Sequence, residues 1–321
     1  MFAMRGIAVS FSVFVILYSA LSVAVCGVWQ RVWLGGQQYS ARRCADLLFA
    51  LRLAPFVVAV GVTLLLAVPS FLLLEPRAVD EPMGAVPVVL SLWGMALLLV
   101  GVWKASAALV RASRTVARWS SQGRASAPIS IDSVNSVSML RISGTAPPLT
   151  AAGILRPAVW LSYAAEFVLT GRELETALRH EVAHVRRRDN LRKLVLRLVA
   201  FPGMAELESA WREATEMAAD DAAVSNASEA LDLAAAVIKL SRLTPVEPAA
   251  ELTTALVHSP AESVNARVER LIAWTDRPQR PALGHSLVYP LCAAAALVIT
   301  LALSYSQLLV RVHAATEWLV R

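Results

Sequence analysis

Four long runs without charged side chains constrain the fold of this chain more than any other feature. Each run is close to or above the ~20 residues that an α-helix needs to cross the hydrocarbon core of a bilayer. Only 17% of the 321 residues are charged, whereas soluble domains carry about 25%. We therefore predict a mainly α-helical membrane protein with four transmembrane helices. The runs are Gly6–Gln30, Leu53–Leu74, Pro82–Trp103 and Pro281–Val310, with the last helix expected at about 286–310.

An alternative interpretation of the first run is a secretory signal peptide. The run follows Arg5, but it is longer than a typical apolar core of a signal peptide and lacks a small-x-small cleavage site. A retained first span is the interpretation that we adopt.

The charges of the loops predict the orientation of these spans. Basic residues exceed acidic ones in the first loop and after the third span, and the second loop is acidic, so the positive-inside rule places the first loop and residues 104–280 in the cytoplasm. Both termini are then outside, with domains at 1–103, 104–280 and 281–321. The basic residues are Arg31, Arg42, Arg43 and Arg52 in the first loop, and Lys104, Arg111, Arg114 and Arg118 after the third span.

The net charge of +6 and the cysteines limit the ligands and partners. No compact basic patch with interleaved aromatic residues occurs, so we expect contact with the lipid bilayer and no direct contact with nucleic acid. The three cysteines form no C-x-x-C pair, so a metal in this chain would be held by histidine and carboxylate.

The sequence His180-Glu181-Val182-Ala183-His184 lies in a helical context. At about 100° per residue the two histidines are about 40° apart on one helix face, so both imidazoles can reach one ion. Glu181 projects beside them, where it can polarise a metal-bound water. This spacing is typical of zinc hydrolases. The capping box Thr170-Gly-Arg-Glu173 predicts the start of the helix, which we expect to continue to about Phe201.

The third ligand is expected from the next predicted helix, Ala205–Val224. Glu216 is the best candidate, and Asp220, four residues later on the same face, could orient a ligand imidazole. The alternatives that remain open for the third ligand are Glu208, Glu213 and Asp221.

Three further residues near the motif have weaker predictions. Arg187 could help to hold the site. Asp189 falls about 180° from His180 on the helical wheel, which favours a structural contact with neighbouring helices. His258 is either a hydrogen-bond donor to the oxyanion or an exposed loop histidine.

The predicted cytosolic domain is of the α+β type. Its β-branched or alternating runs predict a small sheet, and we expect an extended peptide substrate to add to this sheet as a strand. The runs are Ile129–Val134, Val137–Ser143 and Gly153–Ser162, after a Ser/Gly-rich linker at Ser120–Ser126, and further helices are predicted at Ala230–Leu243 and Val264–Ala273.

These motifs resemble the BlaR/MecR-type antirepressor metallopeptidases of bacterial membranes. The pattern H-E-x-x-H-x-x-R-x-D is followed about thirty residues later by E-x-x-x-D, and Gly153–Ser162 is similar to the family's G-x-x-x-P-x-I-x-L strand. The resemblance covers roughly residues 6–310. Lys193 stands where a polar amide is expected. The penicillin-binding domain that follows the fourth span of the β-lactam receptors has no counterpart here, which puts β-lactam sensing in doubt.

The resemblance implies a gluzincin-like zinc endopeptidase in a bacterial cell membrane. Glu181 would be the general base, and the zinc ligands would be His180, His184 and Glu216. The substrate would be a peptide or protein, such as a transcriptional repressor or the chain itself, and the partner a second copy or a separate sensor protein. The alternatives are a housekeeping peptidase similar to HtpX or CAAX proteases, and a non-catalytic signal transducer that keeps the zinc fold as a scaffold.

Overall fold

The computed structural model describes residues 2–36, 40–76, 84–124, 137–142, 147–243, 252–255, 261–276 and 304–320. The chain divides into two compact units. The first contains Met1–Trp29, Leu51–Val100 and Gln279–Arg321, and the second contains Gln30–Ala50 and Gly101–Pro278. Most of the predicted fourth span and the predicted strand at 129–134 lie outside the described residues.

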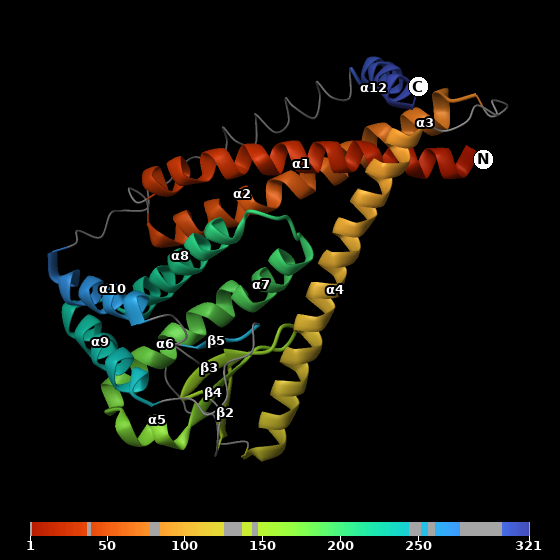
Figure 1. Ribbon diagram of the computed structural model, residues 1–321. Coiled ribbons are helices and arrows are strands. Elements are labelled where there is room, and N and C mark those ends of the chain that lie inside the picture. Colours follow the sequence, from red (N-terminus) through yellow and green to blue (C-terminus); the bar gives the residue numbers. More distant parts are fainter. Residues whose placement is uncertain are drawn as a thin grey trace. The chain divides into compact units, whose positions relative to one another are not determined.

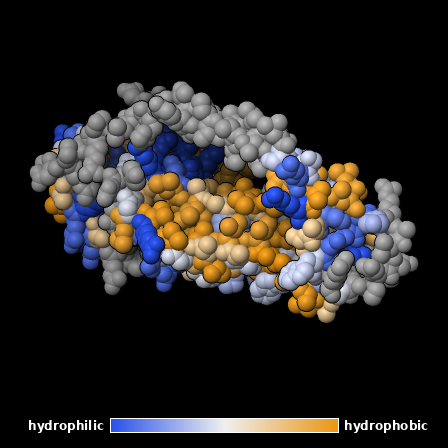
Figure 2. All heavy atoms as spheres, turned by 90° about the horizontal axis from the view of Figure 1, so that it is seen from above, coloured by the Kyte–Doolittle hydropathy of each residue, from blue (hydrophilic) through white to orange (hydrophobic). Residues whose placement is uncertain are grey.

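Three long helical segments are apolar and long enough to cross a membrane (Figure 1). Their exposed apolar side chains contribute to the broad apolar band in Figure 2, and such surface is stable in contact with lipid. These segments indicate a membrane protein. They contain the first two predicted spans and residues 85–103 of the third. They are α1 (Phe2–Gly36), the continuous segment α2 (Ala41–Val62), η1 (Thr63–Ala67) and α3 (Val68–Leu74), and α4 (Ala85–Gln122).

The C-terminal helix α12 (Tyr305–Val320) belongs to the first unit. Ser70 donates a hydrogen bond to the carbonyl oxygen of Leu309 at 2.9 Å, and the Tyr305 hydroxyl donates one to the carbonyl oxygen of Leu65 at 2.8 Å. The start of α12 is therefore packed against η1 and α3, and residues 311–320, expected as a short tail, continue this helix.

From Gly101 onward, α4 belongs to the second unit. A Cβ atom at Gly101 would lie 2.0 Å from the carbonyl oxygen of Leu198, so only glycine permits this approach. Further along α4, Trp119 packs on Trp160 with ring centroids 5.8 Å apart. The helix continues without a break to Gln122, and the linker predicted from Ser120 therefore starts too early.

The second unit contains a small mixed sheet with the strand order β1-β2-β4-β3-β5. Strands β2 and β4 are parallel and the other pairs are antiparallel. The prediction of one strand over Gly153–Ser162 is wrong at its start, because Gly153 has φ 101° and turns the chain between β3 and β4. The strands are β1 (Gly123–Arg124), β2 (Ser138–Ile142), β3 (Leu149–Ala152), β4 (Ala158–Ser162) and β5 (Thr254–Ala255).

The helix α6 (Gly171–Arg187) is central to this unit and contacts β3, β4, α8 and α9 (Figure 1). Its side chains Leu178 and Val182 lie in one core with Val159 of β4 and Leu233 of α9. The other helices are α5 (Tyr163–Val168), α7 (Asp189–Leu198), α8 (Ala205–Ala223), α9 (Ala227–Ser241), α10 (Ala261–Ile272) and the 3-10 turn η2 (Ala273–Asp276).

The prediction of one helix from Thr170 to about Phe201 is wrong in the middle. The predicted capping box is present at the N-terminus of α6, where Thr170 accepts from the Glu173 backbone and Glu173 from the Thr170 backbone. Arg188, however, is left-handed with φ 54°, so the helix ends there and α7 begins at Asp189. A helical wheel that continues past residue 187 therefore gives wrong directions for the side chains that follow.

Candidate metal centre

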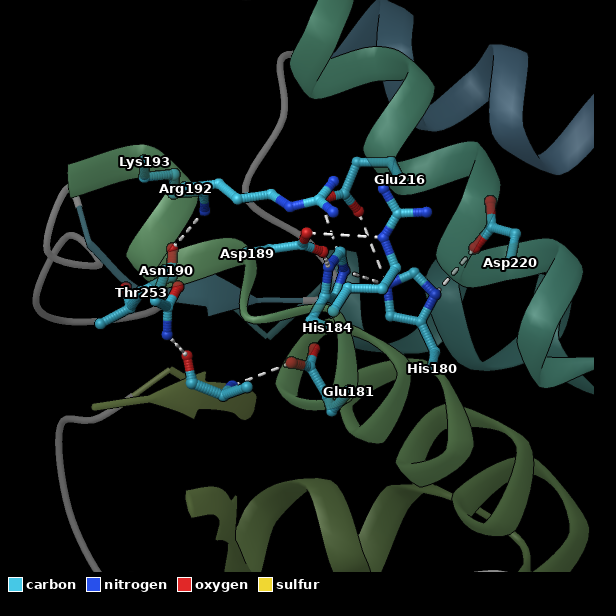
Figure 3. A network of polar contacts seen from close by, with 12 residues as sticks. His180, Glu181, His184, Asp189, Asn190, Arg192, Lys193, Glu216, Asp220 and Thr253 are labelled. Carbon is cyan, nitrogen blue, oxygen red and sulfur yellow. Dashed lines mark hydrogen bonds and ion pairs between the residues drawn. The ribbon is translucent and has the colours of Figure 1, made fainter. Parts of the chain in front are cut away.

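The two motif histidines lie on the buried face of α6. His180 is 0% and His184 1% exposed, and their Nε2 atoms face each other at 3.1 Å (Figure 3). The third member of the group is Glu216 on α8, whose Oε2 lies 3.6 Å from His180 Nε2 and whose Oε1 lies 3.6 Å from His184 Nε2. Buried alanines on α8 (Ala214, Ala218 and Ala219) are small enough to let the two helices pack closely.

The arrangement of these three side chains fits a tetrahedral zinc ion. Ligand atoms ~2.0–2.2 Å from such an ion lie roughly 3.3–3.6 Å from one another. The two Nε2 atoms are 3.1 Å apart, and each has a Glu216 oxygen at 3.6 Å, Oε2 for His180 and Oε1 for His184. Glu216 Oε2 is buried and makes no hydrogen bond to the described residues, although the guanidinium of Arg267 lies 3.2 Å from it. Among the described residues, Glu216 forms this group with the histidines, and Glu208, Glu213 and Asp221 do not.

Each histidine is oriented by a buried aspartate. His180 Nδ1 lies 3.0 Å from Asp220 Oδ1, and His184 Nδ1 lies 2.8 Å from Asp189 Oδ2 (Figure 3). A carboxylate behind a ligand imidazole sets its tautomer and makes it a better ligand. The prediction that Asp189 points away from the histidines is wrong, because the break at Arg188 turns its side chain back toward His184. Arg187 Nε donates to Asp189 Oδ1 at 3.5 Å, so Arg187 contacts the aspartate that orients His184.

Arg267 on α10 is a site residue that the sequence analysis missed. Its guanidinium is 4% exposed, donates to both oxygens of Asp220 at 2.6 and 3.0 Å, and lies 3.2 Å from Glu216 Oε2. The available signal was its place between Val264 and Leu271 on the apolar face of an amphipathic helix. A charged residue in such a place requires a buried partner.

The buried charges shift the pKa values of the group strongly. Burial opposes a charge on His180, but the neighbouring carboxylates of Asp220 and Glu216 outweigh it and raise its pKa to about 9. Burial likewise opposes ionisation of Glu216, yet the nearby histidines and Arg267 lower its pKa to about 2. Burial lowers the pKa of His184. The metal-free group therefore combines an ionised Glu216 with a protonated His180.

Glu181 lies on the side of α6 that faces the sheet. Its Oε2 accepts a hydrogen bond from the backbone N–H of Ala151 on β3 at 2.8 Å (Figure 3). Its Oε1 is buried and has no hydrogen-bond partner in the described part of the chain. Burial is the main cause that raises the pKa of this carboxyl to about 8. A carboxyl group with a pKa near neutrality can both take and return a proton.

Asn190 and Lys193, both on α7, donate hydrogen bonds to the backbone of β3 and of the segment before β5. Asn190 Nδ2 donates to the carbonyl oxygens of Ala151 and Gly153 at 3.1 and 3.2 Å. Lys193 Nζ donates to the carbonyl oxygen of Thr253 at 2.8 Å, and burial lowers its pKa. The position at which the resemblance suggested an amide thus holds an ammonium group that binds backbone.

The edge of β3 beside Glu181 is paired with the chain itself. Residues Thr150 and Ala151 pair with β5, which follows directly on Thr253. A substrate strand could therefore not add to this edge of β3 at Thr150 and Ala151 unless it displaced β5. His258, the candidate oxyanion donor, lies outside the described residues.

A second group of side chains with metal-ligand chemistry lies in the first unit. It contains Glu75, His313 and Glu317, with His313 Nε2 3.5 Å from Glu317 Oε1. Glu75 is ion-paired with Arg5 at 3.3 Å. The carboxylate of Glu75 therefore already has a cation, the guanidinium of Arg5, as its partner.

Comparison with known proteins does not assign the chain to a family. No protein-family model matches it, and no curated protein matches its sequence significantly.

Replacing Asp189 by asparagine should weaken zinc binding by roughly 10–100-fold, because the carboxylate behind His184 is lost. Competition with a chromophoric chelator on the purified full chain measures this affinity. Asp232→Asn on α9 is the matched control and should bind zinc like the wild type. Equal affinities of Asp189→Asn and wild type would contradict the role given to Asp189.

Proposed function

We propose that this chain is an integral-membrane zinc endopeptidase that performs regulated proteolysis. The observation that supports this most is the buried group His180, His184 and Glu216 with the carboxylate of Glu181 beside it. Such a donor set with an adjacent carboxyl is typical of metal-dependent hydrolysis. The motif pattern that resembles the BlaR/MecR-type metallopeptidases supports the same conclusion.

His180, His184 and Glu216 would hold the ion, and Asp220 and Asp189 would orient the two imidazoles. A zinc ion bound there supplies a Lewis acid that polarises the scissile carbonyl and acidifies a water molecule. Glu181 accepts a proton from the attacking water and returns it to the leaving amine, so that a single carboxyl serves as base and then as acid. The N–H of Ala151 holds Oε2 of Glu181 and leaves Oε1 for this proton.

The pairing of β5 with β3 favours a latent enzyme, or one that cleaves its own chain. Residues Thr254 and Ala255 pair with the strand that also binds Glu181, and Lys193 donates a hydrogen bond to the carbonyl oxygen of Thr253. A peptide that enters as a strand would compete with this segment for the same backbone groups. The proposed substrates are accordingly the chain itself and a cytosolic protein such as a transcriptional repressor.

The spans and the loop charges support a location in the bacterial cell membrane with the second unit in the cytoplasm. In this arrangement the site faces soluble cytosolic substrates and Arg42 lies near the inner membrane surface.

The proposal is tested by metal removal and return. Purified chain in detergent should hold one zinc per molecule, lose it and its peptidase activity to a chelator, and regain both with zinc. Glu216→Gln should lose most of its zinc, whereas Glu213→Gln, an exposed neighbour on α8, should keep it. Cleavage that survives complete removal of the metal would contradict the proposal, and zinc without any cleavage would favour the scaffold alternative.

Zinc binding should weaken as the pH falls. The metal takes the neutral form of His180, whose pKa is raised to about 9 in the metal-free protein, so protons compete with zinc below that pH. The expected loss in apparent affinity is at least about tenfold per pH unit between pH 8 and 6. Calorimetric titrations with zinc in two buffers of different protonation enthalpy measure both the affinity and the protons released. An affinity that stays constant over this range would contradict the expectation.

A further inference from the structure

A cavity that none of the proposed metal ligands lines borders α6. It has a volume of about 440 Å³ and lies within the second unit, between residues of α2, α6, α7 and α8. Its charged lining consists of six arginines and a single aspartate, Asp46. The arginines are Arg42, Arg179, Arg186, Arg187, Arg188 and Arg192.

Arg187 contributes a buried guanidinium to this lining, and its Nε donates to Asp189 Oδ1 at 3.5 Å. Its side chain is 10% exposed, and its Nη1 and Nη2 atoms are buried without a hydrogen-bond partner among the described residues. The nearest carboxylate to Nη2 is that of Asp46, at 3.7 Å. A buried guanidinium in this state is costly unless an anion approaches it.

The two aspartates near Arg187 are each shared with another partner. Asp46 accepts a hydrogen bond from Arg192 at 2.6 Å, and Asp189 is shared between His184 at 2.8 Å and the Nε of Arg187 at 3.5 Å. Arg179 is paired with Glu175 and Glu229 outside the cavity lining. These contacts hold the surrounding side chains in place but leave a net positive charge around the Nη atoms of Arg187.

We propose that this cavity binds a phosphate group, and that its source is the headgroup of an anionic phospholipid. Guanidinium groups match the geometry of phosphate oxygens and form charge-assisted hydrogen bonds with them. The volume is in the range of small-ligand sites. Arg42 and Asp46 lie in the first turns of α2, at the start of a candidate span that begins at Ala41. Headgroup phosphates lie at such an end of a span.

Binding of phosphatidylglycerol and of phosphatidylcholine to the full chain is measured in nanodiscs and, from detergent, by native mass spectrometry. Inorganic phosphate, at ionic strength matched with chloride, is the probe for a soluble source. The variants are Arg187→Gln, Arg42→Gln on a different helix, and the control Arg172→Gln, which removes an exposed arginine from the same helix away from the cavity. Arg42→Gln keeps the test valid if loss of the buried Arg187 side chain disturbs folding.

The wild type and Arg172→Gln should retain one phosphatidylglycerol in preference to phosphatidylcholine, and each cavity variant should bind it roughly tenfold or more weakly. If inorganic phosphate binds with the same dependence on Arg187 and phosphatidylglycerol does not, the anion site stands and its assignment to lipid is overturned. Equal binding of both lipids by the wild type without phosphate binding, or unchanged binding by both cavity variants, overturns the proposal. None of these measurements involves zinc or peptide cleavage, so their outcome is independent of the proposed function.

Discussion

Replacing Glu181 by glutamine should reduce peptide cleavage by about 10²–10⁴-fold and leave zinc bound. Glutamine has nearly the same shape, and its amide oxygen can still accept the hydrogen bond from Ala151 N–H that Oε2 accepts at 2.8 Å. It cannot accept the proton of the attacking water. Because Glu181 is not one of the three proposed ligands, the metal group should persist in the variant.

The measurement uses purified full chain in detergent, wild type beside Glu181→Gln. Zinc per chain is determined together with cleavage of the chain itself and of an unfolded protein. Glu175→Gln, on the more accessible face of α6, is the control and should cleave like the wild type. Cleavage by Glu181→Gln at the wild-type rate would remove Glu181 from the mechanism. Zinc in all three proteins without cleavage in any would point to a latent enzyme or a scaffold.

Replacing Arg267 by methionine should destabilise the metal-free second unit by about 3–5 kcal/mol. The substitution leaves Asp220 fully buried and removes the cation that also lies 3.2 Å from Glu216. Methionine fills much of the same space, so the expected loss comes from the uncompensated carboxylates and not from a cavity. Zinc should restore part of the stability, because a dication near Glu216 replaces part of the lost positive charge.

The matched control is Arg270→Gln, one turn away on the same helix. Arg270 is paired with Asp221 at a more exposed place, so its loss should cost about 1 kcal/mol or less. Unfolding of the metal-free proteins, followed by near-ultraviolet circular dichroism, compares the two variants. Adding Asp220→Asn to Arg267→Met should recover part of the loss, because it removes one buried charge. Equal destabilisation by the two single variants would contradict the role of Arg267 as the buried counter-charge.

Local sequence patterns were sufficient for much of the fold. Long uncharged runs predicted the first three spans because length and hydropathy alone decide whether a helix suits a bilayer. The capping box at Thr170 predicted the start of α6, since its two hydrogen bonds lie within four residues. The spacing of His180 and His184 placed both imidazoles on one face because it depends only on helical geometry.

Other features depend on backbone dihedral angles that no local pattern indicated. The left-handed Arg188 separates α6 from α7, and Gly153 turns β3 into β4. The left-handed conformation of Arg188 changes the direction of the Asp189 side chain, which in a continuous helix would point away from the histidines. A single residue outside the helical region is enough to invalidate a helical wheel for everything that follows it.

The sequence by itself determined the apolar spans, the helix that carries the motif and the types of side chain available as ligands, because these follow from periodicity and composition. Only the tertiary structure decided that Asp189 and Arg267 belong to the site, that β5 pairs beside Glu181, and that Arg187 faces a basic cavity. These contacts join segments far apart in the chain or across a backbone break. Their directions are set by packing, and packing cannot be read from spacing along the sequence.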